Sequence, residues 1–474
     1  MCGMIGMFTN RSNNQVSKIK LLRAAETIAH RGPDDKASYI SNDGRFGVGY
    51  RRLSIIDVGG GRQPLISSDG SICVTVNGEI YNHKDIRKEL QLLGHRYNTD
   101  SDSEAVLHGY EQWGMDVVKK LKGMFAFSIY DSNGGPDGKG IVLLARDKLG
   151  IKPMYYSHTS DGLIYGSEIK ALLNLSKGSP EPDMLAVAQY LTLSATPSPK
   201  TMFSGINKLP PGHVAIGNLD GKFEIYEYWN PLDNRVDLVG ATEDEIIELI
   251  LQRLTESIQK RLMADVPFGV YLSGGVDSSL NLALMSQMVS KPIDTFSVSL
   301  ENDDASNENK HARSVASQFG ANHNEILVTQ KQFIDFLPQM AYHQDEPLAD
   351  PVCVPLYYLS AFAKSKGSTV VHVGEGADEL FAGYGNYALM NDFHKSLYSP
   401  FRRLPHFLKN MVSMASPLIL PESRVEYINR ATLNQELFWG GAVVFSESSK
   451  KRLMNQYTDQ NIYSKVIQSY YKEY

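Results

Sequence analysis

The stretch VPFGVYLSGGVDSSLNLALMSQMV, Val266–Val289, runs from an apolar segment through a turn rich in glycine and serine into apolar residues at helical spacing. A short apolar run bounded by glycine predicts a buried strand, and the spacing that follows predicts a helix. Strand and helix patterns go on alternating to about residue 384. Apolar strands separated by helices form parallel sheets covered on both faces, so this half is predicted to be an α/β domain with ligands at the carboxyl ends of its strands.

The turn itself, SGGVDSS from Ser273 to Ser279, has the composition of a phosphate-binding loop. Its glycines let backbone amides approach a ligand, its serines add hydroxyl donors, and the following helix N-terminus carries partial positive charge. The alternative is a tight strand-to-helix turn in which Asp277 and Ser278 cap the helix. The GxxxxGK[ST] pattern is absent from the chain, which argues against a P-loop nucleotidase.

A second loop of this design, VHVGEGADELFAGY, follows another apolar strand at Val371–Tyr384. Carboxylates are again offered where a strand ends, and Asp277 together with Asp378 could hold Mg²⁺ against a triphosphate. The alternative is that acidic residues at a helix start complement its dipole. Two such loops on one predicted sheet edge favour a nucleotide site.

The chain before about residue 206 has a different pattern, with short alternating runs such as ICVTVNGEIY and GMFAFSIYD and two longer helical stretches. This pattern predicts sheets flanked by helices, an α+β arrangement. Stretches rich in Pro, Ser and Gly then mark a connector. We expect a first domain over residues 1–206, a connector over 207–240 and a second domain over 241–474.

Composition excludes several classes of protein. The net charge of −6 and pI near 6.1 give no reason to expect binding to nucleic acid or to an anionic membrane, so the expected partners are small molecules. Three widely spaced cysteines suggest neither disulfides nor a zinc site, and no apolar run is long enough for a membrane helix. We therefore expect a cytoplasmic protein, with a homodimer as an open alternative.

Cys2 occupies an unusual position, directly after the initiator methionine in MCGMIGMF. If Met1 is removed, the thiol and a free α-amine share one residue, and the amine can act as base for the side chain because its usual pKa is about 7.7–8.0. The alternative is a small buried hydrophobic residue, which is less expected at a chain terminus.

Downstream segments offer polar groups that would suit a thiol mechanism on an amino acid. Arg52 of RRLSIID could bind a carboxylate; Asn77 and Gly78 of VNGEIYNH could donate to an oxyanion beside the acceptor Glu79; and Asp102 of TDSDSE could bind an ammonium group. Each has an ordinary alternative: a surface ion pair for Arg52, a turn for Asn77-Gly78 and a helix cap for Asp102.

Taken in order, the motifs resemble the glutamine-hydrolysing asparagine synthetases. The matching segments are MCGMIG, AHRGPDD, RRLSIID, QPL, VNGEIYNH, TDSDSE, LKGMFAFSIYD, ARDKLGIKPMYY, YGSEIKALL, SGGVDSS and GEGADELFAGY. The resemblance implies an N-terminal nucleophile domain of layered α+β sheets that acts as a class II glutamine amidotransferase, followed by an α/β parallel-sheet nucleotide-binding domain of the ATP pyrophosphatase type.

In the first domain the resemblance makes Cys2 the nucleophile that attacks the glutamine amide, with Asn77 and Gly78 stabilising the oxyanion. The glutamine-binding residues that it implies are Arg52, Leu53, Ser54, Ile55, Ile56, Asn77, Gly78, Glu79 and Asp102. Ammonia would then pass to the second site through an enclosed passage, because ammonium in bulk water is not nucleophilic.

In the second domain the resemblance implies that ATP and Mg²⁺ serve acyl-adenylate formation. The implied ATP-binding residues are Tyr271, Leu272, Ser273, Gly274, Gly275, Asp277, Ser278, Val298, Val373 and Gly374. Glu375 is the implied catalytic residue there, with Asp277 and Asp378 as magnesium ligands. The implied reaction amidates an aspartyl-adenylate, giving asparagine, AMP and pyrophosphate.

Three departures from the family pattern keep alternatives open. Val373 stands where serine is common, a change tolerable if the backbone contacts ATP. DEPLADPVCVPLYYLS, Asp345–Ser360, lacks the threonine and arginine that hold aspartate in compact members, which leaves another carboxylate acceptor, such as a cell-wall or glycan precursor. The motif VEARVPFLD does not occur before Tyr474, so we also consider a fragment, or a shortened chain retaining only glutaminase or binding function.

Overall fold

The computed structural model describes all residues except 11–14, 136–137, 234, 302–305, 442, 455–461 and 473–474. The chain divides into two compact units. The first comprises Met1–Pro180, Gly205–Leu337 and Val354–Val373, and the second comprises Glu181–Ser204, Pro338–Cys353 and Gly374–Tyr474.

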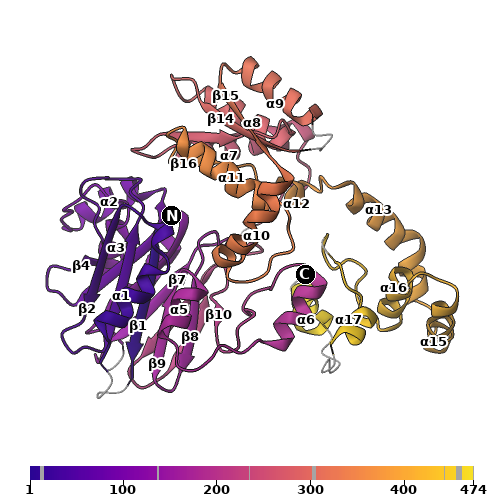
Figure 1. Ribbon diagram of the computed structural model, residues 1–474, viewed down its shortest axis with the longest axis horizontal. Coiled ribbons are helices and arrows are strands. Elements are labelled where there is room, and N and C mark those ends of the chain that lie inside the picture. Colours follow the sequence, from indigo (N-terminus) through magenta and orange to yellow (C-terminus); the bar gives the residue numbers. More distant parts are fainter. Residues whose placement is uncertain are drawn as a thin grey trace. The chain divides into compact units, whose positions relative to one another are not determined.

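Two six-stranded antiparallel sheets form the N-terminal part of the first unit (Figure 1). The first sheet, in the order β10-β8-β9-β1-β3-β2, contains β1 (Gly3–Thr9), β2 (Asp35–Ile40), β3 (Phe46–Arg52), β8 (Tyr155–Thr159), β9 (Gly162–Gly166) and β10 (Asn207–Lys208). The second sheet, in the order β12-β11-β7-β6-β5-β4, contains β4 (Leu65–Ile66), β5 (Ile72–Ile80), β6 (Gly123–Asp131), β7 (Ile141–Arg146), β11 (His213–Asn218) and β12 (Phe223–Glu227).

These sheets pack face to face and carry helices on their outer faces. One buried cluster joins Met4 and Phe46 of the first sheet to Ala126 and Leu144 of the second. A second cluster joins the other face of the second sheet to the helices that cover it. The helices are α1 (Lys18–Glu26) and α5 (Ile169–Leu175) against the first sheet, and α2 (His83–Leu92), α3 (Glu104–Trp113) and α4 (Val117–Lys120) against the second. The predicted layered α+β fold is confirmed.

The segment expected to be a connector, residues 207–240, contains strands β10, β11 and β12, and the residues just before it, which were expected in the first domain, lie in the second unit. Residues 181–204 belong to the second unit and contain α6 (Met184–Leu193), whose start is capped by the Asp183 carboxylate. The chain then returns to the first unit, where 207–227 supply β10, β11 and β12. The alternation in HVAIGN allows β11 to pair along β7, which turn-forming neighbours obscured in the sequence.

The rest of the first unit is the predicted parallel sheet, in the order β15-β14-β13-β16. Its strands are β13 (Phe268–Tyr271), β14 (Asp294–Leu300), β15 (Asn322–Val328) and β16 (Val370–His372). Its flanking helices are α7 (Glu243–Arg261), α8 (Val276–Ser286), α9 (Ser306–Gln318) and α11 (Cys353–Ser365). Helix α10 (Gln330–Gln344) follows β15, and its second half lies in the second unit. Val270 packs with α7, α8 and α9, whereas Phe296 packs with α11, so both faces are covered and the α/β prediction is confirmed.

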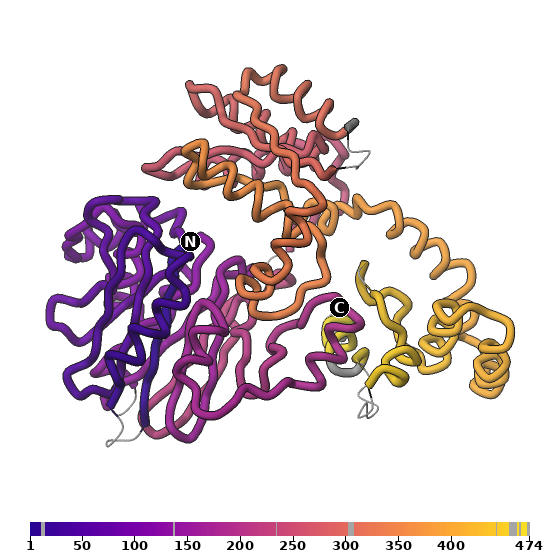
Figure 2. Tube along the Cα trace, in the orientation of Figure 1, coloured from indigo at the N-terminus to yellow at the C-terminus, as the bar shows by residue number. Residues whose placement is uncertain are grey.

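The second unit is helical in its described part, and Figure 2 follows it through the orange and yellow end of the chain. After α6 its helices are α12 (Ala377–Phe381), α13 (Gly385–Phe393), α14 (Ser399–Arg402), α15 (His406–Ala415), α16 (Glu422–Thr432), α17 (Glu447–Leu453) and α18 (Gln468–Lys472). Tyr398, Ala431 and Leu437 form a small core. Among the described residues, none of the helices combines the length and apolar character needed to cross a bilayer.

Candidate active site

The N-terminus is held in place by side chains from distant segments. Cys2 directly precedes β1, and its Sγ donates a hydrogen bond to the Leu53 carbonyl at 3.6 Å. Arg31 Nε donates to the Cys2 carbonyl at 3.0 Å, and Arg31 Nη1 in turn contacts Glu168 Oε1 at 3.0 Å. Neither Arg31 nor Glu168 was predicted as a site residue, although both lie in segments that match the family. Their ion pair fixes the residue that carries the thiol.

Cys2 opens into a cavity that gathers most of the predicted glutamine-site residues. The lining residues are Met1, Cys2, Arg52, Leu53, Ile55, Ile56, Gly61, Gln63, Asn77, Gly78, Glu79, Ser101, Asp102, Ser103, Met124 and Lys152. Of the predicted set, Ser54 is absent from this lining; it is buried, and its N–H donates to Asp34 Oδ2 at 2.8 Å. Gln63, Met124 and Lys152 were not predicted as site residues.

Asn77 and Gly78 lie within strand β5, so the alternative of a surface turn is wrong. Asn77 is fully buried, and neither Nδ2 nor Oδ1 of its amide has a hydrogen-bond partner among the described residues. An unpaired buried polar group lowers the free energy of unfolding by about 1–3 kcal/mol. The unpaired Asn77 amide is therefore free to form hydrogen bonds with a ligand. A Cβ at Gly78 would lie 2.1 Å from the Met124 carbonyl oxygen, which explains glycine at this position.

Two buried carboxylates, Glu79 and Asp102, give the cavity its electrostatic character. Burial, with a smaller contribution from their mutual repulsion, raises the pKa of Glu79 well above its usual value, and burial also raises the pKa of Asp102. The Ile80 N–H donates to Asp102 Oδ2 at 2.7 Å, whereas Glu79 Oε2 has no partner among the described residues. A cation bound here would offset the unfavourable burial of negative charge.

Arg52 is 5 % exposed, so the alternative of a surface ion pair is wrong. Its Nη1 donates to the Val58 carbonyl at 3.2 Å, and its Nη2 donates to the carbonyls of Ile56 and Asp57 at 3.2 and 2.7 Å. The guanidinium therefore organises the loop over residues 53–61 that forms one wall of the cavity. A Cβ at Gly61 would lie 2.7 Å from Arg52 Nη2, which would displace the guanidinium.

Asp265, in the turn before β13, fixes the same loop from outside the cavity. Its Oδ2 accepts a hydrogen bond from the Asp57 N–H at 2.8 Å, and its own N–H donates to the Ile55 carbonyl at 3.0 Å. Asp57 has a φ of +50°, a conformation that residues other than glycine seldom adopt. The contact from Asp265 therefore helps to maintain an unfavourable backbone conformation beside the cavity.

We expect Asp265→Ala to raise KM for glutamine about fivefold, because a lost hydrogen bond of about 1 kcal/mol loosens the loop that the substrate must contact. Asp265→Asn retains an Oδ acceptor and should keep most of the affinity. Steady-state glutamine hydrolysis by the two variants measures the difference. An unchanged KM in Asp265→Ala would show that the loop does not depend on this contact.

The predicted phosphate loop lies at the carboxyl end of β13. Gly274 has a φ of +84°, and a Cβ there would lie 2.6 Å from the Ala312 backbone nitrogen, so this position requires glycine. Ser278 Oγ accepts from the Ser273 N–H at 3.3 Å and donates to the Gly275 carbonyl at 3.3 Å. Asp277 lies in the first turn of α8, and no hydrogen bond or ion pair is found for its carboxylate within the described chain.

The remaining predicted ATP-site residues divide between the two units. Tyr271, Leu272 and Val298 lie at or near the carboxyl ends of β13 and β14, and Val373 follows β16 at the same edge of the sheet. Gly374, Glu375 and Asp378 belong to the second unit, where Asp378 is in the first turn of α12 and its carbonyl accepts from the Gly383 N–H at 2.9 Å. Asp277 and Asp378 are therefore not in one unit.

The two layered antiparallel sheets, with the Cys2 cavity at the head of β1, define a fold of the N-terminal nucleophile type, which is joined to an α/β parallel-sheet domain. Comparison with known families agrees with this class. Residues 1–229 match the glutamine amidotransferase domain, and residues 249–461 match asparagine synthase. The chain belongs to the glutamine-hydrolysing asparagine synthetase family, and as a member it is a glutamine-dependent carbon–nitrogen ligase.

Individual relatives support the assignment. The chain is 34 % identical over 480 residues to asparagine synthetase [glutamine-hydrolyzing] 1 of Bacillus subtilis, covering 100 % of this chain and 72 % of that protein. It is 32 % identical over 467 residues to a putative asparagine synthetase of Mycobacterium tuberculosis H37Rv, covering 96 % and 70 %. A solved glutamine phosphoribosylpyrophosphate amidotransferase of B. subtilis aligns with TM-score 0.36 at 14 % identity over 69 % of this chain and 81 % of that one, which is too weak to support an inference.

Proposed function

We propose that this chain hydrolyses glutamine at Cys2 and uses the ammonia to convert aspartate to asparagine, with ATP cleaved to AMP and pyrophosphate. The observation that carries the first step is the set of unpaired buried groups beside the thiol: the Asn77 amide and Glu79 Oε2. A ligand with one oxygen that accepts a hydrogen bond from Asn77 and one ammonium group that pairs with Glu79 would satisfy both unpaired groups.

The nucleophile requires removal of Met1. In the chain with Met1 attached, burial lowers the pKa of the Met1 amino group to about 5, so the cavity holds this amine in its neutral form. After removal, the free amine belongs to Cys2 and can take the thiol proton. The thiolate then attacks the glutamine amide carbon, ammonia leaves with a proton returned by the amine, and water hydrolyses the thioester to release glutamate.

The substrate contacts follow from the chemistry of the lining. Arg52 binds the α-carboxylate, and Asp102 binds the α-ammonium group, assisted by Glu79. The loop residues Leu53, Ile55 and Ile56 form one wall of the cavity. Asn77 Nδ2 and the Gly78 N–H donate to the tetrahedral oxyanion. Binding of the ammonium group would lower the raised pKa values of Glu79 and Asp102, and the same interaction would contribute to the affinity for glutamine.

We propose that the second step occurs at the carboxyl edge of the parallel sheet. Within the first unit, ATP lies along Tyr271, Leu272 and the Ser273–Ser278 loop, with Val298 and Val373 near the nucleoside. The acceptor carboxylate attacks the α-phosphorus and pyrophosphate leaves; ammonia then attacks the acyl carbon, and AMP departs. The family resemblance implies that Glu375, in the second unit, assists acyl transfer. Activation of the acceptor by ATP is needed because a carboxylate alone is a poor electrophile.

Magnesium fits the donor set of this edge, since carboxylate oxygens suit Mg²⁺ and the Asp277 carboxylate makes no hydrogen bond or ion pair within the described chain. Asp277 of the first unit would hold the ion, whereas the magnesium role of Asp378, in the second unit, is implied by the family resemblance alone. When bound, the ion would neutralise phosphate charge.

The identity of the acceptor is tested by tracing the amide nitrogen of glutamine into the product. Full-length protein is incubated with ATP-Mg, amide-¹⁵N glutamine and either aspartate, candidate cell-wall or glycan carboxylates, or no acceptor. We expect pyrophosphate release only with aspartate, matched by an equal amount of ¹⁵N-asparagine. Labelled product from another carboxylate would identify the alternative amidotransferase. Glutamate formation without pyrophosphate under every condition would contradict the ligase proposal and identify a chain limited to glutamine hydrolysis.

A further inference from the structure

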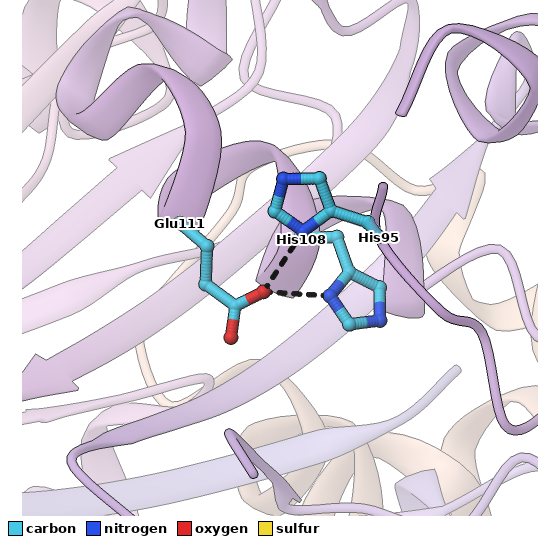
Figure 3. A group of neighbouring side chains, drawn as sticks. All are labelled: His95, His108 and Glu111. Atoms are coloured by element: carbon cyan, nitrogen blue, oxygen red, sulfur yellow. Dashed lines mark hydrogen bonds and ion pairs between the residues drawn. The ribbon is translucent and has the colours of Figure 1, made fainter. Parts of the chain in front are cut away.

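Three side chains of the first unit converge away from the glutamine cavity: His95, His108 and Glu111 (Figure 3). His108 and Glu111 lie three residues apart on α3 and so share one face of the helix. His95 comes from the segment between α2 and α3. Glu111 Oε2 lies 2.7 Å from His108 Nδ1 and 3.3 Å from His95 Nδ1, and one donor atom from each residue lies within 4.8 Å of the other two.

The far nitrogen of each imidazole faces an oxygen acceptor. His108 Nε2 lies 3.3 Å from Glu104 Oε1, and His95 Nε2 lies 2.9 Å from the Gln112 side-chain oxygen. Glu104 is itself fixed, because its carboxylate accepts from the backbone N–H groups of residues 98 and 99 at 2.7 and 2.8 Å. Histidines that bind metals usually donate their other N–H to a carboxylate or carbonyl in this manner, which orients the lone pair on the binding nitrogen.

We propose that His95, His108 and Glu111 form a zinc site, with Glu104 and Gln112 orienting the two imidazoles. Zn²⁺ binds through Nδ1 of each histidine and Oε2 of Glu111, and water takes the fourth position. In this arrangement each Nδ1 lone pair faces the ion, and each Nε2–H faces its acceptor. The site is distinct from the glutamine cavity, since none of these five residues lines it.

The geometry suits zinc in particular. Zinc takes imidazole and carboxylate donors in tetrahedral sites with bonds of about 2.0–2.1 Å, which separates neighbouring donor atoms by about 3.3 Å. The His95 Nδ1–Glu111 Oε2 distance already has this value. Zinc binding would lengthen the 2.7 Å distance from His108 by a movement of the exposed Glu111 side chain, and the two imidazole donors already lie within 4.8 Å of each other. His95 and Glu111 side chains are 17 % and 22 % exposed, so ion and water can enter. Bound zinc would tie the segment preceding Asp102 to α3.

Zinc binding is measured on full-length Cys2→Ser protein without an affinity tag, since the Cys2 thiol and amine could otherwise chelate the ion. After treatment with a chelator and desalting, we expect one equivalent of Zn²⁺ in competition with a chromophoric indicator, and the visible bands of tetrahedral Co²⁺ on titration with cobalt. Zinc should also raise the Tm.

His95→Ala and Glu111→Gln should each weaken zinc binding at least tenfold and remove the Tm increase. Gln112→Ala should weaken binding about tenfold, the usual effect of losing an orienting partner. His158→Ala, at an exposed histidine on β8, is the matched control and should bind as the parent does. Because Glu111 and Gln112 are exposed, their substitution should leave the fold intact. Circular dichroism of each variant checks that any loss of zinc binding does not come from misfolding. Absence of binding in the parent, or equal binding in parent, His95→Ala and Glu111→Gln, overturns the proposal.

Discussion

Cys2→Ser protein is expected to lose glutamine hydrolysis by about 10³-fold or more while continuing to make asparagine from added ammonia. The hydroxyl that replaces the thiol is a far weaker nucleophile at neutral pH, since an alcohol is almost wholly protonated where a thiol is partly ionised. The ammonia-dependent reaction is proposed to occur at the parallel sheet and does not need the thiol. Glutamate release and pyrophosphate release are measured separately, with glutamine or ammonium chloride as nitrogen source.

Cys73→Ala is the matched control, because Cys73 is buried between the two antiparallel sheets and does not line the cavity. It should retain glutamine hydrolysis at a somewhat reduced stability, as expected for a smaller side chain in a packed core. Mass measurement of the active parent should show that Met1 is gone. Glutamine turnover that survives in Cys2→Ser, or active protein that still carries Met1, would refute the assignment of the nucleophile.

Asp277→Asn protein is expected to lose pyrophosphate formation and to keep glutamine hydrolysis, the reverse of what is expected for Cys2→Ser. Replacing this carboxylate by a neutral amide removes the charge proposed to hold magnesium beside the triphosphate, so pyrophosphate formation should fall about 10²-fold or more. Glutamine hydrolysis should be unchanged, because Asp277 does not line the glutamine cavity. The readouts are pyrophosphate with ammonia as nitrogen source and glutamate without ATP.

Asp294→Asn provides the control on the same sheet. Asp294 begins β14, so it lies at the amino end of the strands, opposite to the proposed ATP edge, and its Oδ1 accepts from the Asn322 side chain at 3.1 Å. This variant should form pyrophosphate as the parent does. Equal losses of both activities in Asp277→Asn, or equal losses of pyrophosphate formation in the two variants, would argue against a separate nucleotide site at the end of β13.

Local pattern predicted much of the fold. The apolar run before SGGVDSS became β13 and the spacing after it became α8, because a buried strand and a helix that covers it each leave a periodic signal in the residues themselves. The same reasoning did not find β10 to β12, where a short alternating run is surrounded by turn-forming residues. It also did not foresee that residues 181–204 leave the first unit before the chain returns to it.

For the glutamine site, the sequence by itself supplied the residue types and, through ordered motifs, the family; it supplied no distances. Tertiary structure decided that Cys2, Asn77 and Asp102 share one cavity, that Arg31 and Asp265 support it from outside, and that His95 meets Glu111. The physical reason is that secondary structure follows from neighbours a few residues apart. A cavity depends instead on strand register and on packing between segments as far as 208 residues apart, and these are set by the free energy of the whole fold.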